Sequence, residues 1–179
     1  NHLIRSALLS KLNNPRFAYI APTFKQAKSI AWDYMKQFTA KIPHTKFNET
    51  ELRVDLPNGS RITLLGSESP DGLRGIYLDG CVIDEYANVN SKLFPEIIRP
   101  ALSDRKGYCV FIGTPMGMNN NFYELYQHAQ GAEDWFNYKA KASETLIVDN
   151  DELVKAKEVM GDKKYQQEFE CDWIANIEG

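Results

Sequence analysis

The sequence contains few of the features that place a chain in a functional class at first reading. Its longest apolar runs are only a few residues, far short of the roughly 20 that a membrane-spanning helix needs, and no signal peptide is visible. The formal net charge is −3, so there is no overall basic field of the kind that attracts nucleic acid. We expect no membrane segment, and any contact with DNA has to be local or made elsewhere.

Cysteine and histidine are also scarce, with three residues of each. Cys81, Cys109 and Cys171 lie far apart along the chain, and two of them stand in apolar runs. This pattern fits neither a disulfide framework nor a metal site with paired ligands, and the histidines have no ligand spacing either. The cysteines are therefore interpreted as small buried thiols in a reducing compartment.

One nucleotide-binding signature is missing. A phosphate-binding loop ending in G-K-[ST] needs a glycine followed by a lysine, because backbone amides and the lysine together hold the phosphates. None of the 11 glycines is followed by lysine. Residues 1–179 therefore do not encode such a loop.

What the sequence does contain is an alternation of strand and helix signals. Short apolar runs without alternation indicate buried strands, and apolar residues at helical spacing indicate helices. The segments predict a helix over 1–12, a strand over 16–22, a helix over 23–38, an antiparallel hairpin over 51–67, a strand over 81–83, a helix over 95–102, a strand over 107–113, a helix over 120–129, a further strand over 134–142 and mostly helix over 151–170. This order predicts an α/β fold with a largely parallel sheet and an inserted hairpin.

Two of these segments carry local detail. Thr23 and Gln26 have capping-box spacing, so the Thr23 hydroxyl should accept a free amide while the Gln26 side chain reaches back. The expected apolar face of this helix consists of Phe24, Ala27, Ala31, Tyr34 and Phe38. In the hairpin, Asn58-Gly59 predicts a tight turn in which both central residues have positive φ.

Polar pairs follow three of the predicted strands. They are Pro22-Thr23, Asp84-Glu85 and Thr114-Pro115. Because ligands of parallel sheets bind at the carboxyl ends of the strands, Thr23, Asp84 and Thr114 are candidate nucleotide-binding residues. Each pair taken singly also fits a helix cap, a solvated strand end or a simple turn.

The types of these side chains point to phosphoryl transfer. Asp84 can hold Mg²⁺ through a bound water, and Glu85 can orient and polarise an attacking water. Thr114 can sense the γ-phosphate from the end of the next strand. Arg74, between two glycines in "GLRG", can reach the phosphate of a neighbouring subunit as an arginine finger, or it is a solvated loop residue.

Taken in order, the motifs "APTFKQAK … LLGSESPDGLRG … CVIDEYA … FIGTPMG … NFYELY … YQQEFECDW" resemble the ATPase domain of the large terminase subunit of tailed bacteriophages. The resemblance implies a P-loop NTPase-like three-layer fold. It makes Val82 to Glu85 the Walker B segment with Glu85 catalytic, and Gly113 to Pro115 the coupling motif. It implies that Tyr165 to Trp173 closes the ATPase domain before a nuclease domain.

The same resemblance implies the cofactors and partners. ATP and Mg²⁺ would be used by the full-length protein to drive double-stranded DNA into a procapsid. The partners would be the portal protein, the small terminase subunit and identical subunits in a homo-oligomeric ring. The protein would work in the host cytoplasm, transiently at the procapsid portal, and without contact with a membrane.

The missing G-K-[ST] sequence departs from the family pattern. We therefore expect residues 1–179 to be a single partial ATPase domain that starts after the phosphate loop and lacks the first strand. Its edge at 162–179 would lead toward the nuclease domain. In isolation it should bind Mg-ATP weakly and hydrolyse it poorly or not at all.

Two alternatives remain open. A superfamily-2-like helicase or translocase core also has a Pro-Thr turn, an Asp-Glu strand end and a strand-end Thr. It usually continues as D-E-x-[HD], whereas Tyr86-Ala87 follow here. The other alternative is a degenerate subunit that lost its phosphate loop and only assembles or binds DNA. The presence of Asp84, Glu85 and Thr114 together argues against it.

Overall fold

The computed structural model describes residues 1–174, and the chain divides into two compact units, residues 1–112 and 113–179. The elements of the first unit are α1 (His2–Leu9), β1 (Arg16–Ala21), α2 (Phe24–Ala27), the π-helical η1 (Lys28–Trp32), α3 (Asp33–Thr39), β2 (Lys46–Asn48), β3 (Arg53–Asp55), β4 (Arg61–Gly66), the 3₁₀ turn η2 (Pro70–Leu73), β5 (Gly80–Ile83), the 3₁₀ turn η3 (Tyr86–Asn88), the π-helical η4 (Phe94–Ile98), α4 (Arg99–Ser103) and β6 (Tyr108–Phe111). Those of the second are α5 (Asn121–Ala129), α6 (Ala142–Thr145), α7 (Asn150–Met160) and α8 (Asp162–Glu170).

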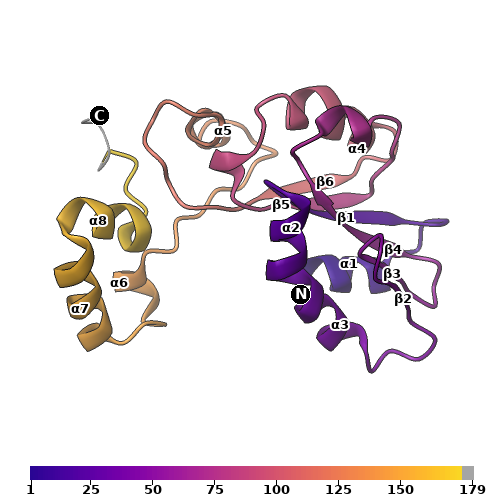
Figure 1. The fold of residues 1–179 in the computed structure, drawn as a ribbon. Helices are drawn as coiled ribbons and strands as arrows, with labels where there is room; N and C mark the ends of the chain where they lie inside the picture. The colour runs from indigo at the N-terminus through magenta and orange to yellow at the C-terminus, as the bar shows by residue number, and fades with distance from the viewer. Residues whose placement is uncertain (175–179) are drawn as a thin grey trace. The chain divides into compact units, whose positions relative to one another are not determined.

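The first unit contains a six-stranded sheet in the order β2-β3-β4-β1-β5-β6 (Figure 1). β1 pairs in parallel with both β4 and β5, and β5 pairs in parallel with β6. β3 is antiparallel to β2 and to β4. The prediction of a mostly parallel sheet with an inserted hairpin is confirmed, and β2 is an additional antiparallel strand without a clear sequence signal.

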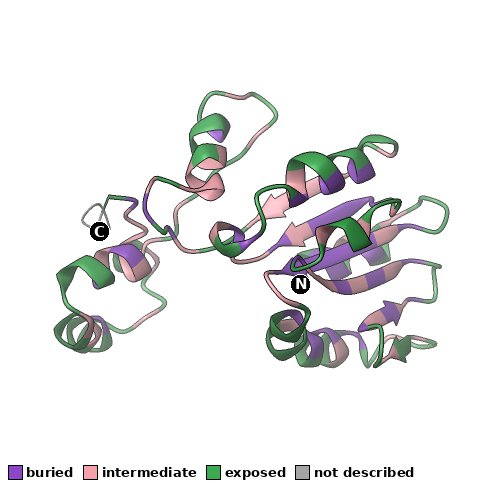
Figure 2. Cartoon of the chain, turned by 45° about the horizontal axis from the view of Figure 1, so that its top comes forward, coloured by how far each residue is buried: buried purple, intermediate pink, exposed green. Residues whose placement is uncertain are grey.

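Helices cover both faces of this sheet, so the unit has three layers (Figures 1 and 2). On one face, α1 and the α2–α3 helix bury a core that includes Leu3, Ile4, Phe17, Tyr19, Trp32, Ile62 and Leu64. On the other face, the ring of Phe94 in η4 meets that of Phe111 in β6 at 4.7 Å between centroids. Because both faces are covered, β1 is buried along nearly its whole length, as its unbroken apolar sequence predicts.

The helix after β1 buries a different face from the predicted one. Beyond Ala31, the side chains buried in the core are Trp32, Met35 and Thr39, whereas Tyr34 is 62% exposed. The π turn of η1 explains the difference, because it inserts one extra residue and so rotates the following residues by about 100° around the helix axis. The predicted apolar face is confirmed for Ala27 and Ala31, which pack against the core. It is wrong for Phe24, Tyr34 and Phe38, which are exposed, and Tyr34 stacks on Phe38 at the surface instead.

The hairpin between β3 and β4 also differs in its turn. The Gly59 amide donates to the Leu56 carbonyl at 3.0 Å, and the Leu56 amide donates to the Ser60 carbonyl at 2.8 Å. Only Gly59 of the Asn58-Gly59 pair has positive φ, at 84°. The hairpin is confirmed, but its connection is a three-residue loop with glycine in the left-handed region, so the prediction of positive φ at both residues is wrong. Pro57 favours this form, since its fixed φ suits the first central position of a type I turn.

The second unit is helical where it is described. Asn120 caps α5 by accepting hydrogen bonds from the amides of Phe122 and Tyr123, and α6, α7 and α8 share a core of Ala142, Leu153 and Tyr165. The helices predicted over 120–129 and 151–170 are confirmed. The strand predicted over 134–142 is wrong, because among residues 1–174 no strand pairs with this segment. Its alternating side chains remain at the surface, with Phe136 88% and Tyr138 72% exposed.

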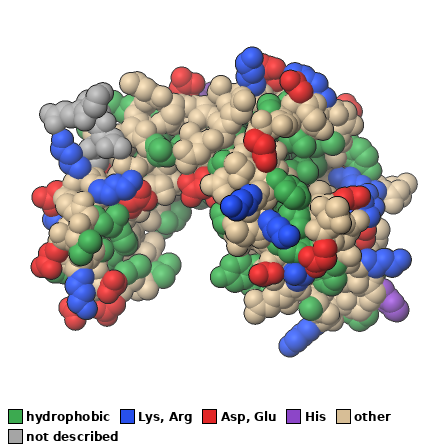
Figure 3. Space-filling model, in the orientation of Figure 1, with side chains coloured by type: hydrophobic (Ala, Val, Ile, Leu, Met, Phe, Trp, Pro, Cys, Tyr) green, Lys and Arg blue, Asp and Glu red, His purple; other side chains and the backbone are tan. Residues whose placement is uncertain are grey.

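Charges of both signs are spread over the surface. On the face shown in Figure 3, Lys and Arg side chains lie interspersed with Asp and Glu, in keeping with the net charge of −3. Within the part of the chain that the structure describes, no helix is long and apolar enough to cross a membrane.

Candidate active site

Two of the polar pairs singled out in the sequence follow neighbouring parallel strands. Pro22-Thr23 comes directly after β1, and Asp84-Glu85 comes directly after β5. The two strands are paired with Ile20 opposite Ile83, so both pairs stand at the same, carboxyl, edge of the sheet. The prediction that parallel strands bring these residues to one edge is confirmed.

Asp84 is held by bonds to its backbone and to both of its carboxylate oxygens. Its amide donates to the Ile20 carbonyl of β1 at 2.8 Å. Oδ2 accepts a hydrogen bond from the Tyr19 hydroxyl, and Oδ1 accepts one from the Glu85 amide at 2.9 Å. Burial and then the hydrogen bond to Asp84 raise the pKa of Tyr19 above its ordinary value, so the phenol stays protonated and remains a donor.

Glu85 has a strained backbone. Its φ of 49° and ψ of 46° lie in the left-handed region, which costs a residue with a Cβ atom roughly 1–2 kcal/mol. The neighbours hold it there, because the Asp84 amide is bonded to β1 and the Tyr86 amide donates to the Ile112 carbonyl at 3.1 Å. Strained residues that are fixed from both sides concentrate at functional sites.

The turn after Glu85 is anchored in the core. Tyr86 is buried, and its ring meets that of Phe111 edge to face at 4.8 Å between centroids. The Asn88 amide donates to the Glu85 carbonyl at 2.8 Å, which closes the 3₁₀ turn. Glu85 therefore stands on a rigid bend between a buried strand and a buried aromatic side chain, while its own side chain is partly exposed.

Thr23 serves as the cap of α2. Its hydroxyl oxygen accepts a hydrogen bond from the Gln26 amide at 3.1 Å and donates to the Gln26 side-chain carbonyl at 2.9 Å. Of the predicted capping box, the hydrogen bond from the Gln26 amide to the Thr23 hydroxyl is confirmed. The Gln26 side chain, however, accepts a hydrogen bond from the Thr23 hydroxyl instead of reaching back to the Thr23 amide. The nucleotide-binding role predicted for Thr23 stays a prediction.

Glu68 is a further neighbour of this cap. Its carboxylate accepts hydrogen bonds from the Phe24 amide at 2.8 and 3.1 Å, where the positive end of the helix dipole favours a negative charge. The chain passes so close here that a Cβ atom on Gly66 would lie 2.2 Å from the Phe24 nitrogen. Glu68 stands in a polar loop and Tyr19 in an apolar strand, so neither shows a sequence signal for its contact.

Arg74 is exposed and paired within its own unit. Its Nε donates to Asp71 Oδ1 at 2.8 Å and its Nη2 to Glu96 Oε2 at 3.3 Å. The bond to Asp71 is the larger cause of the raised pKa of the guanidinium. Exposed ion pairs of this kind hold a side chain only weakly. Thr114 belongs to the second unit, follows β6 by three residues and is partly exposed.

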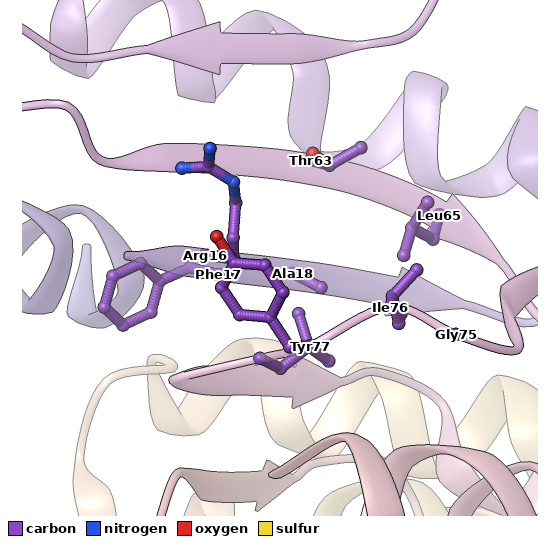
Figure 4. A pocket seen from close by; sticks show the side chains of 9 residues that line it. Arg16, Phe17, Ala18, Thr63, Leu65, Gly75, Ile76 and Tyr77 are labelled. Atoms are coloured by element: carbon purple, nitrogen blue, oxygen red, sulfur yellow. The ribbon is translucent and has the colours of Figure 1, made fainter. Parts of the chain in front are cut away.

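One cavity of the first unit is lined by none of these residues. It has a volume of about 280 Å³ and is lined by β1, β4 and the loop before β5, as Figure 4 shows for Ala18, Thr63, Leu65 and Tyr77. Its lining includes no carboxylate. The candidate chemistry therefore belongs to the open edge of the sheet and not to this cavity.

The donor atoms at Asp84 fit a divalent cation bound through water. Each Asp84 oxygen accepts one hydrogen bond from the protein, and a carboxylate oxygen has a second acceptor site that a metal-bound water can use. Mg²⁺ keeps several waters and combines one or two carboxylates with phosphate oxygens. Within residues 1–174 no group of three or more His, Cys, Asp or Glu side chains is placed to hold a metal, so the remaining ligands would be phosphate and water.

Comparison with known proteins identifies the family of this fold and site. The model of a family described as "Terminase large subunit, T4likevirus-type, N-terminal" matches residues 5–178. The chain belongs to this family. Because the chain belongs to the terminase family, the alternative of a superfamily-2-like helicase or translocase core is set aside. It also confirms the resemblance on which the roles of Asp84 and Glu85 are predicted.

Two relatives are terminase large subunits from Thermus phage G20c and Thermus virus P23-45. Each is 30% identical to this chain over 126 residues, a match that covers 60% of this chain and 26% of the relative. The match thus spans about a quarter of those terminases. The chain corresponds to the N-terminal part of a terminase large subunit.

Solved terminase structures share the fold. The ATPase domain of the Thermus phage P74-26 large terminase superposes with a TM-score of 0.77 at 22% identity, over 94% of this chain and 80% of that one. The large terminase of another thermophilic bacteriophage, in complex with ADP, superposes with a TM-score of 0.73 at 15% identity, over 92% of this chain and 42% of that one. This second terminase is also solved with ATP-gamma-S, and its TM-score is then 0.70 at 15% identity, over 97% of this chain and 43% of that one. The predicted P-loop NTPase-like fold is confirmed.

Proposed function

We propose that this chain supplies the water-activating half of an ATPase site whose turnover drives double-stranded DNA into a procapsid. Family membership supports the packaging role, and the solved terminase complexes with ADP and ATP-gamma-S support ATP as the nucleotide. The observation that carries the proposal for this chain is the strained, doubly anchored bend that presents Glu85 beside Asp84. Backbone strain that the surroundings maintain is typical of active sites, and orienting an attacking water is a task that suits a carboxylate.

Glu85 is the proposed general base and water-orienting residue. The water oxygen forms a bond to the γ-phosphorus while the bond from that phosphorus to the β–γ bridging oxygen breaks. Glu85 takes one proton from the water, and ADP leaves with the bridging oxygen. The fixed backbone of Glu85 limits the positions of its carboxylate, which lowers the entropic cost of aligning the water.

Asp84 is the proposed holder of the metal end of the site. Mg²⁺ bound through water at Asp84 would neutralise negative charge on the phosphate oxygens. The Tyr19 hydroxyl and the Glu85 amide fix the two carboxylate oxygens, so Asp84 is already oriented before a nucleotide arrives. Tyr19 acts here as a positioning residue.

Thr114, Thr23 and Arg74 are proposed in supporting roles. Thr114 would sense the γ-phosphate from the segment after β6, and Thr23 would contact the nucleotide from the segment after β1. Arg74 would leave its exposed partners Asp71 and Glu96 to reach the phosphates of an adjacent subunit in a homo-oligomeric ring. Exposed ion pairs are weak, which suits a residue that has to change partners.

The partners of the complete protein are proposed from the family. They are double-stranded DNA, the portal protein and the small terminase subunit, met in the host cytoplasm and transiently at the procapsid portal. We also propose that the complete protein carries a nuclease domain after the ATPase domain. The fraction of the relatives' length that this chain matches leaves room for one.

The decisive experiment compares two variants of a full-length terminase that contains this chain. Glu85→Gln should abolish ATP turnover while Mg-ATP still binds, because the amide keeps the shape of the side chain and loses the base. Glu158→Gln, an exposed position in α7, is the matched control and should leave turnover unchanged. Steady-state hydrolysis and nucleotide-binding titrations give the two readouts, and turnover retained by Glu85→Gln would remove Glu85 from the mechanism.

A second experiment concerns residues 1–179 in isolation. Because they contain no Gly-Lys pair, the phosphates lose the cradling amides and the lysine that a phosphate-binding loop supplies. Calorimetric titration of this chain with Mg-ATP should therefore show no tight binding. Binding in the micromolar range would contradict the proposal that this chain holds only part of the nucleotide site.

A further inference from the structure

Two of the three cysteines meet in the fold, although they are 28 residues apart in sequence. Cys81 in β5 and Cys109 in β6 are directly paired across the parallel strands, and their sulfur atoms lie 3.3 Å apart. Neither cysteine is in a disulfide. The sequence separation of the two residues hides this contact, which exists only because the fold places β5 beside β6.

The two thiols share one face of the sheet. Their neighbours Val82 and Tyr108 pack against the core on the side of α1, so by strand alternation Cys81 and Cys109 point to the opposite side. Cys81 has no exposed surface, whereas Cys109 is partly exposed because β6 ends the strand order described for residues 1–174. Cys109 is therefore the more accessible residue of the pair.

The geometry suits a covalent link. Paired residues on neighbouring strands have Cα atoms about 4.8 Å apart. Disulfides join residues whose Cα atoms are roughly 4.4–6.8 Å apart. The sulfur atoms are 3.3 Å apart, so they have to approach by about 1.3 Å to reach the S–S bond length of about 2.05 Å.

We propose that Cys81 and Cys109 are a modification site that closes to a disulfide when a hydroperoxide oxidises the folded protein. In the first step Cys109 sulfur attacks the peroxide oxygen, the O–O bond breaks, and a sulfenic acid and water (or an alcohol) are formed. In the second step Cys81 sulfur attacks the sulfenic sulfur and the S–O bond breaks, giving the disulfide and a second water. Two thiols and one hydrogen peroxide thus yield one disulfide and two waters.

This site goes beyond the proposed function, and its position gives it a consequence. The link would tie β5, which leads to Asp84 three residues after Cys81, to β6, the strand before the Thr114 segment. Burial, and then the neighbouring Cys81, raise the pKa of Cys109 above its usual range, so little thiolate is present at neutral pH and closure is slow. Hydrogen peroxide therefore has to be supplied in excess, and formation of the disulfide has to be followed over hours.

The test uses the unmodified chain with hydrogen peroxide, followed by peptide mass mapping. In the folded chain the expected product has lost two hydrogen atoms and joins the peptides of Cys81 and Cys109. Cys171, in the second unit, is the internal reference and should not replace Cys109 in the link to Cys81, because the contact lies between the two strand thiols. In urea the same chain should give all three intramolecular pairings, and a reducing thiol should restore the original mass in both cases.

Two single-cysteine substitutions provide an additional test of which thiols form the link. Cys109→Ala should prevent loss of the two hydrogens and Cys171→Ala should not, with circular dichroism confirming that each variant is folded. A folded wild-type chain that gains oxygen at Cys109 without a cross-link overturns the proposal. So does a chain whose Cys81–Cys109 link forms only in urea, or whose two strand thiols stay unmodified after Cys171 is fully oxidised.

Discussion

The hydroxyl of Tyr19 in β1 donates a hydrogen bond to Oδ2 of Asp84 at the end of β5. The contact crosses between two parallel strands and joins a buried aromatic residue of the core to the first carboxylate of the candidate site. A residue of the hydrophobic core thereby takes part in orienting a polar group at the edge of the sheet.

Tyr19→Phe should weaken ATP turnover in the full-length protein and leave the fold intact. A hydrogen bond to a charged group is worth about 1.5–3 kcal/mol, which corresponds to a fall in kcat of roughly 10- to 100-fold if the whole bond serves orientation. The Mg²⁺ concentration for half-maximal turnover should rise as well, a shift that a purely structural defect would not cause. Unchanged Mg²⁺ dependence would show that Tyr19 does not position Asp84.

The burial of Tyr19, together with the same bond, predicts a loss of stability at alkaline pH. Tyr19 has its pKa raised in the folded state, so its contribution is fully present below the unfolded value of about 10 and is lost as pH rises toward the folded value. Urea unfolding of this chain between pH 8 and 11 (roughly the range that brackets the unfolded tyrosine pKa) should show falling stability at the alkaline end. Tyr19→Phe should make that decline shallower, and an equal slope in both proteins would contradict the assignment.

Glu85→Gly should separate stability from function. Glycine adopts positive φ without the steric cost that a Cβ atom brings, so the free energy of unfolding should stay equal or rise by up to about 1 kcal/mol. Turnover in the full-length protein should nevertheless disappear, because the carboxylate is gone. Glu85→Val is the contrasting variant and should destabilise, since β-branched residues fit this region poorly. Denaturant titration and an ATPase assay measure the two effects.

Gly66→Ala should destabilise the first unit, and Gly72→Ala should not. A Cβ atom at Gly66 would lie 1.9 Å from Glu68 Oε2 and 2.2 Å from the Phe24 nitrogen, and the backbone atom cannot move aside without shifting α2. We expect a loss of about 1–3 kcal/mol, as for other overpacked positions. Gly72 has nothing within 4 Å of such an atom and should change by less than about 0.5 kcal/mol. Equal stability of the two variants would contradict the close approach.

Trp32→Ala and Tyr34→Ala test which face of the α2–α3 helix is buried. Trp32 is 2% exposed and donates its indole N–H to Glu49 Oε2 at 2.6 Å, so truncation should cost about 3–5 kcal/mol. Tyr34→Ala removes an exposed ring and should cost less than about 1 kcal/mol. If the sequence-predicted face were correct, the order of the two losses in urea unfolding would be reversed.

Local signals explain why much of the fold is predictable from the sequence. β1 and β5 are short apolar runs that end in polar pairs, and a parallel sheet brings such ends to one edge whatever the details of packing. That relation is sufficient to place Asp84 and Glu85 near Thr23. The backbone strain of Glu85 is not predictable in this way, because it arises from hydrogen bonds that neighbouring segments impose on Asp84 and Tyr86.

The predictions that the structure contradicts also fail because of interactions that the local sequence does not contain. The π turn before Asp33 changes the register of a helix whose apolar residues fit an unbroken 3.6-residue period equally well. The alternation around Phe136 and Tyr138 indicates which side chains would lie on the same face of a strand. A strand also needs a neighbouring strand that forms hydrogen bonds with its backbone, and the local sequence does not show whether there is one. The contact of Cys81 with Cys109 depends on strand order, which no local pattern contains.

Glu68 has a consequence for how any nucleotide meets this edge of the sheet. The amides at the start of a helix are a common seat for a phosphate, yet at α2 the Phe24 amide is already bonded by the protein's own carboxylate, and the Gln26 amide by Thr23. Glu68 acts as a built-in competitor for anions, and an incoming phosphate would meet its negative charge before it met the helix. A nucleotide that contacts Thr23 would therefore do so without placing a phosphate on the first amides of α2.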